Sequence, residues 1–211
     1  DVCSSIFYQI INFKTAAKRE LHKWVCGVNS LLPKDIVVKD IAVVADEFNA
    51  RFAAVRRTYH YYLLLTSTRP AILYSKVGWY HGELDIELMQ EALERLIGQR
   101  DFSSFRAANC QAKNPIRDLT NAKLTAKNNG NETLLRFEFT ANAFLYHMIR
   151  NIVGALVYVG NGKLSLSDFD NIVNACDRRL APPTFMADGL YLVNVEYNDQ
   201  TLRKPNLEWI F

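Results

Sequence analysis

Residues 119–140 read LTNAKLTAKNNGNETLLRFEFT, and this stretch decides the fold class. Its two outer runs, 119–126 and 133–140, are rich in Leu, Phe and Thr, which suit strands. Between them Asn128–Asn131 reads NNGN, and Asn and Gly are the residues that adopt the positive φ angles of tight turns. The stretch therefore predicts a long antiparallel hairpin.

Helical patterns lie on both sides of this hairpin. Before it, residues 84–97 (LDIELMQEALERLI) repeat apolar side chains at helix spacing. After it, residues 144–159 and 168–176 are predicted helices, and Ser165 or Ser167 is the expected N-cap of the second. Helices separated by hairpin strands do not fit the regular alternation of a doubly wound fold.

Further elements are predicted toward the two ends of the chain. Residues 6–13 (IFYQIINF), 36–45, 51–66 and 190–197 are apolar, β-branched or aromatic and predict strands, and residues 16–31 predict a helix. No fixed-period repeat or low-complexity segment occurs. We therefore expect an α+β fold with a mostly antiparallel sheet and flanking helices.

The composition excludes several classes of protein. With 211 residues, 49% hydrophobic and 22% charged, the chain can bury a core and is not expected to be disordered. The net charge of +3 permits an anionic partner without demonstrating one. Four scattered cysteines and four scattered histidines give no metal or disulfide pattern, and reduced thiols favour the cytosol. No apolar run reaches the roughly 18 residues of a membrane span.

Residues 51–65 (RFAAVRRTYHYYLLL) interleave basic and aromatic side chains. Strand alternation places Arg57, Tyr59 and Tyr61 on one face. A cation beside aromatic rings suits the stacking of an exposed base and the binding of its phosphate. A Tyr-rich strand with solvated arginines is an equally good interpretation of the pattern.

Residues 141–156 (ANAFLYHMIRNIVGAL) place His147 and Arg150 on one face of a helix whose neighbours are mostly apolar. An arginine is costly to bury there without an anion, so Arg150 could serve a phosphate or a catalytic carboxylate. A structural ion pair is the alternative.

Residues 101–118 form a polar stretch without clear periodicity. They hold Arg106, Lys113 and Arg117 together with two phenylalanines, and long loops of this kind are often binding loops. The two phenylalanines, Phe102 and Phe105, could instead simply anchor the loop to the core.

Taken together, these segments resemble the TruA family of tRNA pseudouridine synthases over essentially the whole chain. Several specific motifs occur in the family's order. They are Gly27-Val28-Asn29, Phe48-x-Ala50-Arg51-Phe52, Asp101-Phe102-x-x-Phe105-Arg106-Ala107, His147-Met148-x-Arg150-Asn151 and Gly189-Leu190-Tyr191-Leu192.

The resemblance also places the catalytic carboxylate. The family's nucleophilic aspartate lies eight residues before a Gln, and Asp1 lies eight residues before Gln9. Residues 2–5 (VCSS) stand where the family has Ala-Gly-Val-His, so either the chain begins partway through its parent or the loop has diverged. We expect residues 1–80 to be the remainder of an incomplete N-terminal lobe carrying Asp1, and residues 81–211 to be the C-terminal lobe.

The resemblance implies a mechanism and a substrate. The family isomerises uridine to pseudouridine in the tRNA anticodon stem-loop, at positions 38 to 40, without cofactor or metal and as a homodimer. A carboxylate can act as nucleophile or proton carrier in such a reaction. Matched to the family, Asp1 is the catalytic residue. Three residues would bind the substrate: Tyr59 stacks on the uracil, Arg150 pairs with Asp1 and Leu192 packs under the base. The residues expected to contact the rest of the tRNA are Arg57, Arg106 and His147.

Other functions remain open at this point. The first alternative is a TruA-like protein that binds or chaperones tRNA but has lost catalysis through its altered Asp1 loop. A small-molecule enzyme of unrelated chemistry would leave the basic aromatic strand unexplained. We expect a cytoplasmic protein that does not contact a membrane.

Overall fold

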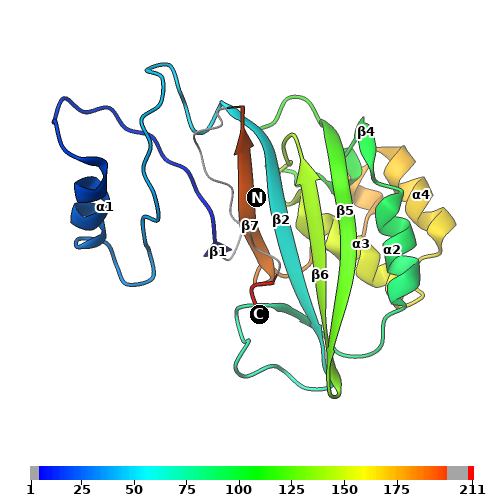
Figure 1. Ribbon diagram of the computed structural model, residues 1–211. Coiled ribbons are helices and arrows are strands. Elements are labelled where there is room, and N and C mark those ends of the chain that lie inside the picture. Colours follow the sequence, from blue (N-terminus) through cyan, green and yellow to red (C-terminus); the bar gives the residue numbers. More distant parts are fainter. Residues whose placement is uncertain (1–4, 199–208) are drawn as a thin grey trace.

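A computed structural model of the protein describes residues 5–198 and 209–211. Its strands join in one sheet in the order β1-β7-β2-β6-β5-β4, with β3 beside β2 (Figure 1). The strands are β1 (Ser5–Ile6), β2 (Ala54–Leu65), β3 (Gly78–Tyr80), β4 (Gly98–Asp101), β5 (Ile116–Asn129), β6 (Glu132–Ala141) and β7 (Leu190–Tyr197). The helices are α1 (Leu21–Asn29), α2 (Ile86–Glu94), α3 (Met148–Gly160) and α4 (Leu166–Ala175), with 3-10 turns at Ser103–Phe105 and Arg178–Leu180.

The hairpin at the centre of the sheet is the predicted one. Strands β5 and β6 pair antiparallel and are longer than expected, and Gly130 turns the chain between them with a φ of 60°. Only the β1/β7 and β2/β3 pairs are parallel among the described strands. The expected mostly antiparallel sheet is therefore confirmed.

Three helices cover one face of this sheet, as Figure 1 shows for α2, α3 and α4. Their apolar side chains and those of the sheet form the main core, in which Phe137, Ile152 and Phe169 are fully buried. Burying one such side chain contributes about 1.5–3 kcal/mol. Helix α4 begins at the predicted N-cap, because Ser165 and Asp168 form a capping box.

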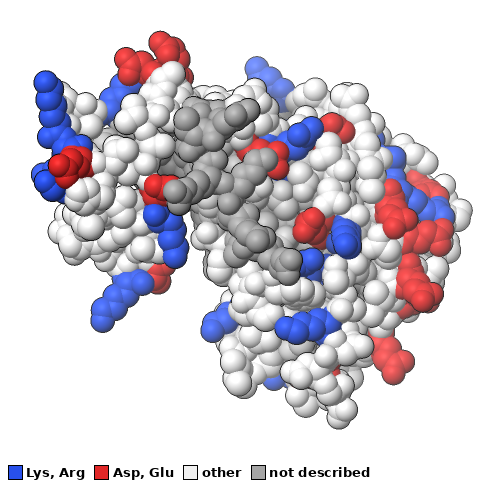
Figure 2. All heavy atoms as spheres, in the orientation of Figure 1, with Lys and Arg blue, Asp and Glu red and all other residues white. Residues whose placement is uncertain are grey.

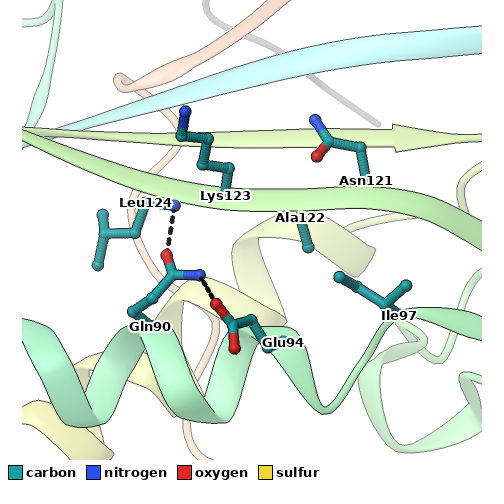
Figure 3. Close-up of a pocket in the computed structure, with 7 residues that line it drawn as sticks. All are labelled: Gln90, Glu94, Ile97, Asn121, Ala122, Lys123 and Leu124. Atoms are coloured by element: carbon teal, nitrogen blue, oxygen red, sulfur yellow. Dashed lines mark hydrogen bonds between the residues drawn. The ribbon is translucent and has the colours of Figure 1, made fainter.

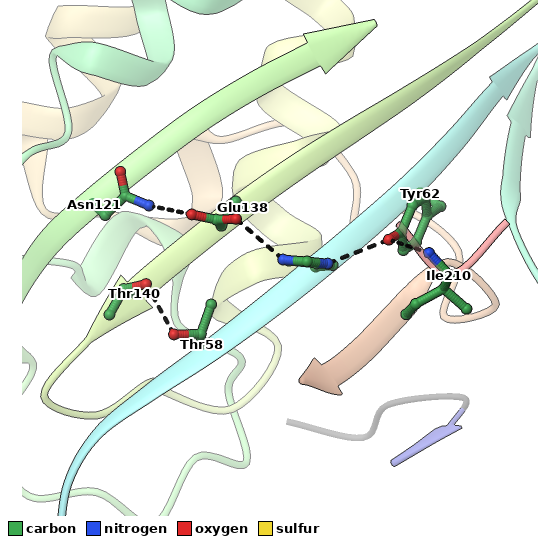
Figure 4. Close-up of polar contacts among 7 residues, drawn as sticks. Thr58, Tyr62, Asn121, Glu138, Thr140 and Ile210 are labelled. Carbon is green, nitrogen blue, oxygen red and sulfur yellow. Dashed lines mark hydrogen bonds and ion pairs between the residues drawn. The ribbon is translucent and has the colours of Figure 1, made fainter. Parts of the chain in front are cut away.

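The opposite face carries a smaller core that includes the C-terminal residues. The ring of Tyr62 contacts those of Trp209 and Phe211, at centroid distances of 6.2 and 5.4 Å. The Tyr62 hydroxyl accepts a hydrogen bond from the backbone N of Ile210 at 3.1 Å (Figure 4). Hydrophobic packing and a hydrogen bond thus hold the chain end on the sheet.

A buried polar chain continues across this face from Tyr62. His60 is 2% exposed and lies with Nδ1 3.2 Å from the Tyr62 hydroxyl and Nε2 3.2 Å from a Glu138 oxygen. Asn121 donates to the other oxygen of Glu138 at 2.6 Å (Figure 4). Each polar group therefore has a partner, as buried polar groups require.

Helix α2 partly covers the part of β5 that does not pair with the edge strand β4. Strand β4 pairs with β5 only from Ile116 to Leu119. Farther along, Gln90 of α2 accepts a hydrogen bond from the backbone N of Leu124 at 2.7 Å and donates to Glu94 (Figure 3). The shallow pocket in Figure 3 is this junction between helix and strand.

The N-terminal predictions are largely wrong. Of the predicted strand 6–13 only Ile6 lies in a strand, together with Ser5 in β1. Residues 36–45 form no strand. The predicted helix 16–31 is shorter, and α1 buries none of its residues. Helix α1 lies apart from the sheet (Figure 1), whereas the chain just after β1 still contacts β7 through Phe7 and Tyr8. Without a neighbouring strand to satisfy the backbone, apolar composition alone does not make a strand.

Three other boundaries differ from the predictions. The short strand β4, which lies between the helix predicted at 84–97 and the polar stretch 101–118, was not predicted. Helix α3 begins four residues later than expected, since His147 adopts a left-handed φ of 58° and cannot continue a helix backward. Strand β2 matches its prediction closely and shares one sheet with β5, β6 and β7. The proposed boundary between two lobes at residue 80 stays a prediction.

Candidate active site

Two of the predicted site residues are direct neighbours in the sheet. Tyr59 of β2 lies opposite Leu192 of β7, next to an irregularity in the pairing between Thr58 and Tyr59. The Tyr59 ring packs edge-on against Phe144 at 5.1 Å between centroids. Strand pairing and one aromatic contact thus fix Tyr59 in place.

The predicted open aromatic face of β2 is wrong. Tyr59 is only 7% exposed and Tyr61 fully buried, both in the helix-covered core. The Tyr61 hydroxyl donates to the carbonyl of Met186 at 2.8 Å, and burial strongly raises its pKa. The strand is aromatic because it lies inside the sheet. A base could reach only the small exposed part of the Tyr59 ring.

Arg150 is held by two contacts near the start of α3. Its Nε donates to the carbonyl of Phe185 at 2.9 Å, and its Nη1 lies 3.1 Å from His147 Nε2. Burial and the positive charge of Arg150 lower the pKa of His147, so the neutral ring can accept this hydrogen bond. The two residues are in contact as expected, but His147 precedes α3 and does not share a helical face with Arg150.

The segment after α4 makes the other wall of the site, and the sequence analysis did not single it out. Phe185 N donates to the Arg150 carbonyl at 3.1 Å while the Phe185 carbonyl receives Arg150 Nε. Gly154, one turn farther along α3, lies so close to the carbonyl oxygen of Pro183 that a Cβ would collide with it. The glycine therefore allows the segment to lie directly on the helix.

Asn151 ties two loops to this helix. Its side chain is fully buried, and its Nδ2 donates to the carbonyl of Phe105 at 2.7 Å. Its Oδ1 accepts from the Thr184 hydroxyl at 2.6 Å and from Arg178 Nη2 at 3.2 Å. The motif around Arg150 contained this residue, but only the fold shows which loops it joins.

The remaining predicted contacts lie at the end of the sheet. Arg57 donates to the carbonyls of Asn142 and Arg51 at 3.2 and 3.0 Å. Arg106 uses its Nη2 on the carbonyls of Cys110 and Ala112, at 2.8 and 2.6 Å. Both side chains therefore brace the backbone. Asp1, the predicted catalytic residue, lies outside the described residues.

Charge is unevenly distributed over the surface. Acidic side chains gather over the edge formed by α2 and α4 (Figure 2). They include Glu87, Glu91, Glu94, Asp168 and Asp170. This edge would repel a polyanion, so an RNA must approach elsewhere.

Neither a metal centre nor a membrane span emerges from the described part of the chain. No three His, Cys, Asp or Glu side chains there are placed to share a metal ion. None of the helices described combines the length and apolarity needed to cross a membrane.

Comparison with known proteins agrees with the motifs. Residues 92–198 match the family model described as tRNA pseudouridine synthase. The chain is 50% identical over 192 residues to tRNA pseudouridine synthase A of Chromobacterium violaceum, covering 91% of this chain and 72% of the relative. It is 47% identical over 204 residues to that of Neisseria meningitidis serogroup C, covering 96% and 76%. The chain belongs to the TruA family of tRNA pseudouridine synthases.

This membership confirms the family resemblance and the prediction of an isomerase. The matched range runs from α2 to the end of β7 and includes Arg106, His147, Arg150 and Leu192, whereas Tyr59 precedes it. The roles assigned to individual residues stay predictions.

Proposed function

We propose that the chain isomerises uridine to pseudouridine in tRNA. The observation that carries this proposal is the meeting of Tyr59, Leu192 and the Arg150 end of α3 at one place in the fold. Tyr59 and Leu192 are cross-strand partners, and Phe144 links Tyr59 to the turn that leads into α3. TruA-family membership supplies the reaction that these residues would serve.

The reaction needs one carboxylate and a fixed base. The N1–C1′ bond breaks, the uracil rotates and a C5–C1′ bond forms; C5 then loses its proton to water while N1 gains one. We assign the carboxylate to Asp1, acting as nucleophile or proton carrier. Tyr59 would stack on the flipped uracil and Leu192 would pack under it.

Arg150 would keep the carboxylate ionised. Its Nε and Nη1 are held by the Phe185 carbonyl and His147, which fixes the plane of the guanidinium. Nη2 is the donor that we assign to Asp1. A positive charge within hydrogen-bond reach of a carboxyl group lowers its pKa and favours the charged form.

The finer proposals follow the family resemblance. We assign the anticodon stem-loop as the target, a homodimer as the working assembly and the cytoplasm as the location, with no cofactor or metal. Partly exposed Arg57 lies at the end of β2 nearest Tyr59 and is the residue we place on a phosphate. His147 and Arg106 would order the surfaces beside it.

Tritium release tests the proposal directly. tRNA carrying 5-tritiated uridine should lose tritium to water when incubated with the wild-type protein, because C5 exchanges its proton for the glycosidic bond. Asp1→Asn should bind the tRNA and release none. Binding without release by the wild type would instead favour the non-catalytic tRNA-binding alternative.

The stacking role of Tyr59 has its own test. Tyr59→Phe keeps the ring and should stay active, while Tyr59→Leu should lose about 1–3 kcal/mol of base stacking. Since Tyr59 also packs in the core, thermal unfolding of both variants must be measured alongside. Equal activity of Tyr59→Leu and wild type would remove Tyr59 from the site.

A further inference from the structure

Two arginines are cross-strand partners at one end of the sheet. Arg100 of β4 pairs directly with Arg117 of β5. Two residues farther along β5, Leu119 lies opposite Ala141 of β6, and Ala141 lies opposite Arg57 of β2. The arginine pair and Arg57 therefore belong to the same end of the sheet, where β2 and β5 begin and β6 ends (Figure 1).

The helix-covered face carries this pair. Arg117 lies two residues before the buried core residue Leu119, so alternation sends both side chains to the same face. Arg100, as the cross-strand partner, shares that face. Helix α3 and its Arg150 lie on this side as well.

Neither guanidinium is neutralised by a carboxylate. Arg100 Nη2 donates to the Ile97 carbonyl at 3.3 Å, and Arg117 Nη1 donates to the Asn114 and Ile116 carbonyls at 2.8 and 2.6 Å. Within residues 5–198 and 209–211 no Asp or Glu lies within ion-pair distance of either arginine. The Nε atoms of both are buried without a hydrogen-bond partner.

This arrangement is costly without an anion. Like charges directly opposite each other in a sheet are destabilising, and a partly buried guanidinium whose Nε has no partner loses hydration at that atom. Burial, and in smaller part the charge of Arg106, lowers the pKa of Arg117. By contrast Arg95 and Arg179 each meet a carboxylate. Arg136 also has a buried Nε without a hydrogen-bond partner, but its guanidinium lies over the Trp209 ring at 4.7 Å. Arg100 and Arg117 have neither a carboxylate nor a ring contact among the described residues.

A series of contacts connects the pair to the candidate active site. Arg106, whose charge reaches Arg117, holds the carbonyl of Cys110. Cys110 Sγ lies 3.4 Å from the backbone N of Tyr146, and the Tyr146 ring stacks on His147 at 4.0 Å. His147 in turn contacts Arg150. The positive end of the sheet is therefore continuous with the site.

We infer that Arg100 and Arg117 form a phosphate-binding pair for the tRNA backbone next to the target uridine. The inference rests on the proposed function for its ligand. The planar fork of arginine matches the oxygens of a phosphodiester, and two arginines on neighbouring strands of one sheet face can share a single phosphate. Arg106 positions the loop beside them and does not itself contact RNA.

Salt-dependent tRNA binding by the full chain tests this site. The double variant R100Q/R117Q should bind tRNA more weakly, and the slope of log K against log salt should fall by about 1 for the one shared phosphate. The KM for tRNA should rise while kcat at saturating tRNA stays unchanged. Arg69→Gln, which removes one exposed arginine beyond the opposite end of β2, is the matched control and should behave as wild type.

The outcomes separate this site from the activity. If wild type releases tritium and R100Q/R117Q matches Arg69→Gln in affinity and salt slope, the phosphate site is wrong and the proposed function stands. If wild type binds tRNA without releasing tritium, the function fails, and the salt slope still decides the site. Should the double variant unfold, Arg117→Gln alone must lower the slope, and an unchanged slope would overturn the site.

Discussion

The N-terminal segment and the sheet teach different lessons about apolar sequence. Residues 6–13 are as apolar as the end of β2, yet Ile11 is 73% exposed and Leu63 is fully buried. Strand β2 has a partner on each side, β6 and β7, whereas residues 7–13 form no strand, although Phe7 and Tyr8 donate backbone hydrogen bonds to the Leu192 carbonyl of β7. Partners in space, more than local composition, decide which apolar run becomes a strand.

The largest expected effect lies in the sheet. Phe137 is fully buried in β6, directly opposite Tyr61 and Leu124. Phe137→Ala should lower the free energy of unfolding by about 3–5 kcal/mol, because it removes a large side chain from a packed core. Urea unfolding at neutral pH measures this. A loss below about 1 kcal/mol would show that the sheet core is no better packed than the N-terminal segment.

The sequence predicted what local pattern and neighbours in the chain determine. The hairpin of β5 and β6, the Ser165 cap and strand β7 were all predicted, since each depends on residues close in sequence. The short strand β4 was missed, because four residues become a strand only when β5 lies beside them.

The candidate site, like the fold, has parts that the sequence predicted and parts that it did not. The motif containing His147 and Arg150 was visible because the two residues are three positions apart in the chain. The wall supplied by Pro183 and Phe185 was not, because Pro183 contacts Gly154 and Phe185 contacts Arg150, which lie 29 and 35 positions earlier in the chain. The aromatic strand around Tyr59 was read as a surface because composition does not distinguish a buried ring from an exposed one.

A smaller effect is expected where that wall meets α3. Gly154→Ala would push a methyl group into the carbonyl of Pro183, and overpacking of this kind costs about 1–3 kcal/mol. It should also reduce tritium release, since Phe185 holds Arg150. Gly160→Ala is the matched control in the same helix, because its methyl group meets the flexible side chain of Met89 at 2.6 Å. Equal effects of both substitutions on activity would show that the wall does not position Arg150.

The stability contributed by the His60–Glu138 hydrogen bond, on the face of the sheet opposite the three helices, should depend on acid pH. Hydrogen bonding to His60 lowers the pKa of Glu138 below its unfolded value of about 4.3, so the ionised carboxylate stabilises the fold above that pH. This contribution is lost as pH falls through the folded pKa. Glu138→Gln should therefore cost about 1 kcal/mol at pH 7 and approach no difference from wild type near pH 3, as followed by urea unfolding. A gap between the two proteins that stays constant over this range would contradict the linkage.

The smallest effect should come from the N-terminal segment itself. Ile11 is 73% exposed, so Ile11→Ala should change the free energy of unfolding by less than about 0.5 kcal/mol. Ile152, fully buried in α3, is the matched control, and Ile152→Ala should cost about 2–5 kcal/mol. A cost above about 1 kcal/mol for Ile11→Ala would mean that the Ile11 side chain packs against the rest of the protein despite its exposure. The apolar sequence of the segment would then predict burial correctly, and the segment would differ from β2 only in not pairing as a strand.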